Sequence, residues 1–161
     1  FDRFITTIFE IIRPIPPVSW IPLTILWMGI GLKAKAFIIF FAAFIPCVIN
    51  AQTGVKLTNK TLINVAKTSG ASNLETFYKV AIPSAMPMVF TGIRVAVGNA
   101  WSTLVAAEML AASAGLGYMI LMGRMFARAD IILLGMAVIG AIGALFNAIL
   151  SFVENHVIRW R

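Results

Sequence analysis

The stretch of sequence that decides the fold is TNKTLINVAKTSGASNLETFYKVAIP, residues 58–83, a polar island between long apolar runs. Its first part has the pattern of a short amphipathic helix, with leucine, isoleucine and alanine on one face and lysines off it. Thr58 is placed to cap the start of this helix. Gly70 suits the left-handed conformation that ends helices, because glycine has no Cβ to clash. The sequence therefore predicts a helix that begins at Thr58 and ends at Gly70.

A second helix is predicted directly after this turn. Ser72-Asn73-Leu74-Glu75 is a capping box, in which the serine side chain satisfies a free N–H and Glu75 reaches back to the first residue. Pro83 is expected to end this second helix. A rigid unit of helix, tight turn and helix can seat in a groove of a soluble partner and transmit its movement. Two ordinary surface helices in a loop would give the same pattern, so the pattern alone leaves both interpretations open.

The composition of the chain is that of a membrane protein. Of its 161 residues, 60% are hydrophobic and only 12% are charged, and the mean hydropathy is +0.94. Such a chain has too little polar surface to cover a soluble core. The net charge of +7 lies in connectors between apolar runs, with no basic patch interleaved with aromatics, so no nucleic-acid partner is expected. Cys47 and His156 each stand alone, and neither a metal site nor a cofactor is expected.

Four apolar segments follow an interfacial amphipathic helix predicted at residues 1–12. They are residues 18–30, 36–49 (long enough for a span when counted from residue 32), 85–113 and 131–153. The first is short for a span, which needs about 20 residues. Polar connectors at 50–84 and 114–130 separate the later segments. The fold class expected is therefore all-α, a polytopic helical bundle embedded in a lipid bilayer.

The distribution of basic residues predicts the orientation. If the 50–84 connector is cytoplasmic, the inner side carries eight of them: Arg3, Arg13, Lys56, Lys60, Lys67, Lys79, Arg159 and Arg161. The outer side then carries four: Lys33, Lys35, Arg124 and Arg128. This excess follows the positive-inside rule, so a multi-pass protein of the plasma or inner membrane is expected, with the connector in the cytoplasm.

The apolar segment 85–113 contains polar residues at helical spacing. Arg94, Trp101 and Glu108 are seven residues apart, so they drift by only about 20° per step and form one stripe. Charges within a span normally face protein or water, so this stripe is predicted to face the interior of the bundle. One hypothesis makes Arg94, Trp101, Ser102 and Glu108 part of a substrate path, with Arg94 near the cytoplasmic side and Glu108 at an outer gate. The alternative is that the charges pair with neighbouring helices for assembly.

The last apolar segment has small residues at steps of four: Gly140, Ala144 and Ala148, with Ala137 and Ala141 alongside. Small side chains let helix backbones approach closely in membranes. This pattern predicts helix packing.

The connector resembles the EAA loop of ABC-importer permeases. That loop reads Glu-Ala-Ala, three residues, glycine, nine residues, then Ile-x-Leu-Pro; Ala66, Gly70 and Pro83 match it, whereas Asn64 replaces the glutamate and Val65 an alanine. The lost carboxylate leaves the helix–turn geometry intact but removes any ion pair that a glutamate would make. The resemblance implies that the connector binds a separate ABC ATPase. The residues implied in this coupling are Asn64, Val65, Ala66, Lys67, Gly70, Ala71, Ser72 and Pro83.

Further runs resemble the nitrate/sulfonate/taurine branch of these permeases, above all WSTLVAAE at 101–108, with RPIPPVSWIPL at 13–23, WMGIG at 27–31, TGIR at 91–94 and GLG at 115–117. The resemblance covers nearly the whole chain, here a permease domain over 1–161. It implies the MetI-like bundle of ABC type I importers, a permease homodimer, two ATPase subunits and an external solute-binding protein. Such permeases usually have six spans, so about the first two are expected to be missing. The chain has no phosphate-binding loop of its own, so ATP hydrolysis is assigned to the partner chain and no enzyme activity to this one.

The substrate implied by the resemblance is a small anion, with taurine or an aliphatic sulfonate favoured. Nitrate, bicarbonate and a vitamin precursor remain alternatives. An ion-coupled secondary transporter is a second class, with Arg94 and Glu108 as a coupling pair, but it leaves the 58–83 unit unexplained and no internal repeat supports it. An intramembrane enzyme would need a nucleophile and base, or metal ligands, and the chain offers one cysteine, one histidine and a single intramembrane carboxylate.

Overall fold

The computed structural model describes residues 14–157, and every regular element in that range is helical. A 3₁₀ turn, η1 (Pro17–Trp20), leads into α2 (Ile21–Met28), and α3 (Leu32–Lys56) follows. The connector holds α4 (Lys60–Thr68), α5 (Asn73–Thr76) and a π-helical turn, η2 (Phe77–Ala81), and η2 runs into α6 (Ile82–Ala111). The chain ends with α7 (Leu116–Met125) and α8 (Ala129–Val157). The predicted all-α class is confirmed.

Three helices are long and apolar enough to cross a membrane: α3, the continuous helix from Asn73 to Ala111, and α8. The 25 residues of α3 correspond to about 38 Å of helix, more than the roughly 30 Å of a hydrocarbon core. Many of their large apolar side chains are exposed, Phe40 and Leu133 among them. Helices satisfy their backbone hydrogen bonds internally, so this apolar surface is suited to lipid.

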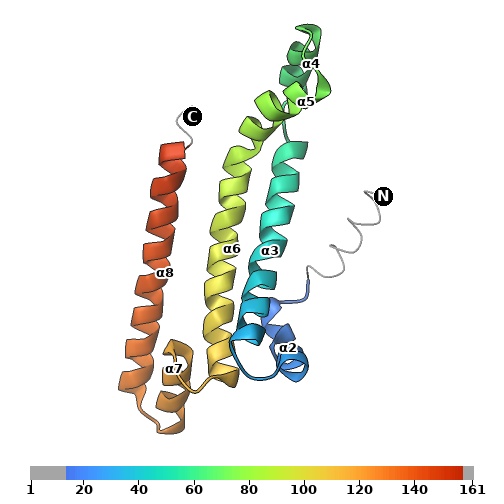
Figure 1. Ribbon diagram of the computed structural model, residues 1–161. Coiled ribbons are helices and arrows are strands. Elements are labelled where there is room, and N and C mark those ends of the chain that lie inside the picture. The colour runs from blue at the N-terminus through green and yellow to red at the C-terminus, as the bar shows by residue number, and fades with distance from the viewer. Residues whose placement is uncertain (1–13, 158–161) are drawn as a thin grey trace.

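The centre of the fold is the pair of helices α3 and α6, which lie side by side (Figure 1). Glycines allow the close approach. A Cβ on Gly92 of α6 would lie 2.7 Å from the Cβ of Asn50 in α3, and a Cβ on Gly54 of α3 would lie 2.9 Å from the Cβ of Met88 in α6. Both distances are too short for carbon atoms, so these crossing points require glycine.

The segment predicted at 18–30 does not form a full span in the described structure. It divides into η1 and α2, and Pro22 lies in the first turn of α2, where proline is tolerated because its missing N–H has no partner there. The Trp20 ring packs 5.6 Å from that of Phe41, and Ile21 is buried against Ile38. These contacts place the segment along the half of α3 that is remote from the connector (Figure 1).

The predicted 114–130 connector contains a helix, α7, which turns the chain between α6 and α8. The α8 helix packs mainly on α7: a Cβ on Gly135 would lie 2.6 Å from Ile120, and one on Gly123 would lie 3.1 Å from Ile132. Contacts between α8 and α6 are sparse, and the small residues Gly140, Ala144 and Ala148 are exposed. The packing predicted for them therefore stays a prediction that no contact within the described range tests.

The connector lies at one end of the molecule, and α2 and α7 lie at the other (Figure 1). The amphipathic helix predicted at 1–12 lies outside the described residues, as do Arg3, Arg13, Arg159 and Arg161. Of the basic residues counted for topology, the described ones divide equally: Lys56, Lys60, Lys67 and Lys79 at the connector end, and Lys33, Lys35, Arg124 and Arg128 at the other. The charge excess thus depends on the termini, and the orientation stays a prediction.

Candidate functional site

The connector forms the predicted unit of helix, turn and helix, with one correction at its start. The cap of α4 is Asn59, whose side-chain oxygen accepts a hydrogen bond of 2.9 Å from the Thr61 N–H. Thr58 was the wrong prediction: it is 6% exposed, one residue before the cap, and its buried hydroxyl finds no partner in the described structure. Asparagine is as good a cap as threonine, so the sequence signal was off by one position.

The turn after α4 is a Schellman motif, as glycine at position 70 predicts. Gly70 has a φ of +84°, its N–H donates to the Lys67 carbonyl, and the Ala71 N–H donates to the Ala66 carbonyl, both at 3.0 Å. The turn therefore satisfies carbonyls that the end of the helix would leave free. The left-handed conformation expected at Gly70 is confirmed.

The predicted capping box is also present. The Glu75 N–H donates to the Ser72 hydroxyl at 3.2 Å, and the Ser72 N–H donates to the Glu75 carboxylate at 3.0 Å. Lys79 holds the same carboxylate from one turn further on, at 3.3 Å. This chain of local bonds joins the turn to the helix that follows, so the connector is stiff on that side.

Pro83 does not end the second helix, contrary to the prediction. The helix begun by α5 continues through the π turn η2 into α6, and the Ile82 N–H bonds to the carbonyl of Phe77, five residues back. A proline lacks the N–H that an α-helix needs, but Pro83 follows directly on the wider π turn, in the first turn of α6. Consequently the turn at Gly70 is joined to the membrane span by one uninterrupted helix.

The connector carries an exposed apolar surface. None of the side chains of α4 is buried; Leu62 is 49% exposed and Val65 is 57% exposed. Together with α6 these side chains border a groove of about 410 Å³. Its lining includes Leu62, Val65, Ala66, Lys79, Val80, Pro83 and Ser84. Of the predicted coupling residues, Val65, Ala66 and Pro83 thus meet in one groove, Asn64 and Lys67 are exposed on α4, and Gly70, Ala71 and Ser72 form the turn.

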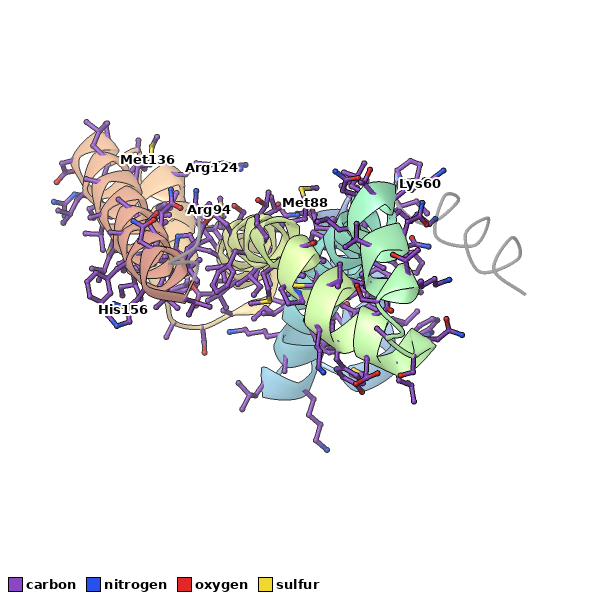
Figure 2. The ribbon with its side chains drawn as sticks, turned by 90° about the horizontal axis from the view of Figure 1, so that it is seen from above. Lys60, Met88, Arg94, Arg124, Met136 and His156 are labelled. Atoms are coloured by element: carbon purple, nitrogen blue, oxygen red, sulfur yellow. The ribbon has the colours of Figure 1, made fainter. Side chains whose placement is uncertain are left out.

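Arg94 joins α6 to α8. Its guanidinium donates to the Glu154 carboxylate at 2.6 Å and to the Ser151 hydroxyl at 3.1 Å. Viewed along the bundle, Arg94 lies between the two helices (Figure 2). The side chain of Glu154 is only 20% exposed, whereas that of Arg94 is 42% exposed. The positive charge is therefore already neutralised, by a partner 60 residues away that the sequence pattern did not indicate.

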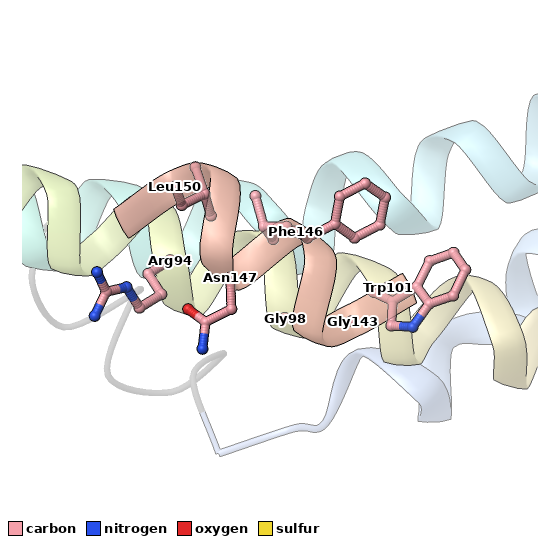
Figure 3. Close-up of a pocket in the computed structure, with 8 residues that line it drawn as sticks. Arg94, Gly98, Trp101, Gly143, Phe146, Asn147 and Leu150 are labelled. Carbon is pink, nitrogen blue, oxygen red and sulfur yellow. The ribbon is translucent and has the colours of Figure 1, made fainter. Parts of the chain in front are cut away.

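Trp101 makes the second polar contact between these helices. Its indole N–H donates to the Ile139 carbonyl at 3.2 Å, and its ring meets Phe146 edge-on at 5.5 Å. Between this contact and Arg94 lies a cavity of about 180 Å³ (Figure 3). Ser102 is exposed, and its hydroxyl donates to the Gly98 carbonyl of its own helix.

Glu108 caps α7. Its carboxylate accepts the Gly117 N–H at 3.0 Å, in the first turn of that helix, where the helix dipole favours a negative charge. A Cβ on Gly115 would lie 2.4 Å from the carboxylate, and one on Gly117 would lie 2.3 Å from the Val105 carbonyl oxygen. Only glycine fits at these two positions, so Glu108 and the Gly-Leu-Gly turn form one packed unit.

The stripe of Arg94, Trp101 and Glu108 therefore faces protein, as its spacing predicts, and each member contacts a neighbouring helix. These contacts are what the assembly alternative requires, and the substrate-path hypothesis for the four residues stays a prediction. Within the described range no group of three or more histidine, cysteine or acidic residues could hold a metal ion.

A surface ion pair lies in the turn after α7. The hydrogen bond with Asp130 raises the pKa of the Arg128 guanidinium above its ordinary value.

Long apolar helices joined by a stiff polar loop define a helical membrane protein that presents a rigid unit outside its spans. Comparison with known sequences places it more closely. The model of the family described as the binding-protein-dependent transport system inner membrane component matches residues 1–161, and the chain belongs to this family. The bundle is accordingly of the MetI-like kind and sits in the cell membrane.

Several relatives are similar over most of this chain. A putative ABC transporter permease of Methanocaldococcus jannaschii is 43% identical over 156 residues, 96% of this chain. The taurine transport system permease of Escherichia coli is 39% identical over 95% of the chain, and the nitrate import permease of Leptolyngbya laminosa is 33% identical over 94%. The chain spans 58%, 56% and 54% of the lengths of these three relatives.

Proposed function

We propose that this chain is the translocation subunit of an ATP-driven importer of a small anion. The family and the names of the relatives support the class, since two of the relatives are named as permeases for taurine and for nitrate. The observation that carries the proposal is the groove between α4 and α6, whose apolar residues Leu62 and Val65 lie open at one end of the bundle. Exposed apolar grooves of this kind mark protein interaction sites.

The proposed partner for this groove is an ABC ATPase subunit, gripping residues 58–83. The Schellman turn at Gly70 and the capping box at Ser72 leave the connector little internal freedom. Because the helix then continues without a break into α6, a push on the connector tilts that whole span. Closure of the ATPases would in this way switch the spans between outward and inward access. A second copy of the permease and an external solute-binding protein complete the proposed transporter.

The substrate we favour is taurine or another aliphatic sulfonate, because the run at 101–108 resembles those permeases most closely and the taurine permease of Escherichia coli is 39% identical. Nitrate comes next, on a relative of 33% identity. An ion-coupled secondary transporter is the competing class. Uptake that survives ATP depletion but not an uncoupler would favour it.

Photo-crosslinking tests the coupling. A benzoylphenylalanine at Val65, in the groove, should form an adduct with the ATPase subunit in membranes that hold the full-length transporter. The same residue at Leu26, 80% exposed at the opposite end of the molecule, is the matched control and should form none. An adduct at Leu26, or none at Val65 when uptake is intact, would remove the proposed coupling surface.

A further inference from the structure

The face of α6 opposite the Arg94 stripe borders a second cavity. Asn99 lies five residues beyond Arg94, which turns it by about 140° around the helix. There, a cavity of about 260 Å³ lies between α3, α6 and the segment of Ile15 and Pro17, and its lining includes Asn50 and Asn99. Because α3 runs from 32 to 56 and α6 from 82 to 111, this cavity lies near the middle of both helices.

The cavity holds uncharged groups with hydrogen-bonding capacity to spare. Pro46 lies inside α3 and has no N–H for the carbonyl of Ala42, one turn earlier. Asn50 donates one side-chain N–H to the Pro46 carbonyl at 2.8 Å, and its amide keeps a second N–H and an oxygen. Asn99 is exposed and its amide makes no hydrogen bond within the described residues. Unpaired polar groups are costly in hydrocarbon, so a polar occupant is the economical solution.

We propose that this cavity is a polar station on the solute path, where the side-chain N–H groups of Asn50 and Asn99 hydrogen-bond the oxygens of a small oxyanion, such as a sulfonate or nitrate group. The inference rests on the proposed function and deepens it. The cavity volume of about 260 Å³ has room for such a ligand, because a single water molecule needs only about 10–15 Å³ of volume measured in the same way. Within the described residues that line it, no side chain is charged.

Neutral amides fit a transport path better than the Arg94 stripe does. A path must bind its solute well enough to admit it and weakly enough to release it, and amide hydrogen bonds meet both demands. The guanidinium of Arg94 is bound to Glu154 at 2.6 Å and to Ser151. An anion would have to displace that carboxylate, and the adjacent negative charge would repel it. The structure thus separates the two faces of α6 into a tethering face and a solute face.

Cysteine accessibility in the full-length protein tests this assignment. Cys47, and any cysteine of the full-length protein outside these 161 residues, is replaced by alanine. Asn99→Cys is then compared with Gly98→Cys, which borders the Arg94 cavity and has room for a side chain, and with Leu145→Cys, an exposed apolar position on α8. The probe is 2-sulfonatoethyl methanethiosulfonate, which carries a sulfonate and reacts with thiolates. Since a thiol in lipid stays protonated, Asn99→Cys should react at least about tenfold faster than Leu145→Cys. Added taurine or nitrate should slow the reaction of Val95→Cys, a position that lines the cavity and leaves both asparagines in place.

Two results would overturn the inference: an Asn99→Cys that reacts no faster than the lipid-facing control, or a Gly98→Cys that reacts faster than Asn99→Cys and is the one protected by the anions. The Val65 crosslink is measured on the same membranes, so that the coupling proposal and the solute-station proposal are tested separately. A crosslink without Asn99 labelling would contradict the solute station alone. Protected labelling without a crosslink would support the station and contradict the coupling to an ATPase.

Discussion

At the residue scale, the two charged side chains within α6 each have a hydrogen-bonding partner on a neighbouring helix. Arg94 meets Glu154 across two helices, and Glu108 meets the N–H of Gly117 at the start of α7. The Arg94 contact connects elements that otherwise touch little, since α8 is held to α6 mainly by Arg94 and Trp101, whereas α7 also packs closely on α6. Charged side chains in a span are tolerated when they find such partners. The charges therefore account for how α7 and α8 are attached to α6.

Removal of the Arg94 side chain should lower the stability of the protein. Arg94→Ala would leave the Glu154 carboxylate, 20% exposed, without its charged partner, and we expect a loss of stability of about 1–3 kcal/mol. The double exchange of Arg94→Glu with Glu154→Arg should recover most of it. The measurement is thermal unfolding of the purified protein in lipid nanodiscs.

The control for this exchange is Arg128→Ala. Arg128 pairs with Asp130 at the surface, with side chains 59% and 63% exposed, so its loss should change the unfolding temperature little. Uptake provides the second readout. If the exchanged pair is stable yet transports nothing, the assembly role is insufficient and Arg94 acts on the substrate.

At the scale of elements, α7 packs against both α6 and α8 and so positions α8. It begins on the Glu108 carboxylate, and its glycines pack against α6 on one side and α8 on the other. The close approach depends on glycine at 115 and 117, because added Cβ atoms would meet Glu108 and the Val105 carbonyl. The second connector is therefore a packed element of the bundle and not a free loop.

Gly117→Ala should destabilise the packing of α7 on α6. The new Cβ would lie 2.3 Å from the backbone oxygen of Val105, which cannot move without shifting α6, so a loss of about 1–3 kcal/mol is expected. Gly31→Ala is the matched control, since nothing lies within 4 Å of a Cβ at Gly31. Thermal unfolding of both variants in nanodiscs is the measurement. Equal stability of the two would contradict the packing described for α7.

At the scale of the whole molecule, polar chemistry is divided between its ends and one internal face. The stiff connector projects from one end, and α2 and α7 lie at the other (Figure 1). Exposed apolar side chains, suited to lipid, cover the helices between them. In the proposed transporter the connector end meets the ATPase and the other end meets the binding protein. This arrangement requires the connector to be cytoplasmic.

The orientation can be measured with single cysteines on the Cys47→Ala background. Lys60→Cys, exposed in the connector, should react with a membrane-impermeant maleimide only in inside-out vesicles. Lys33→Cys, exposed at the other end, should react only in right-side-out vesicles. The reverse pattern would place the connector outside the cell and would end the proposal of ATPase coupling.

The sequence by itself determined the local features of this protein. Two of these features, the Gly70 turn and the capping box at Ser72, depend on hydrogen bonds between residues at most five apart, so the residue types in one short segment predict them. The spans follow from the apolar composition of their segments. Two local predictions were wrong: Thr58 in place of Asn59, a single-residue shift between two good caps, and Pro83 as the end of the second helix.

Only the tertiary structure decided which partners the polar residues have. Glu154 lies 60 residues from Arg94, and the cavity at Asn50 and Asn99 forms only where α3 and α6 cross on glycines. These features depend on how helices dock and on small shifts in helical register, which the periodicity of one segment does not encode.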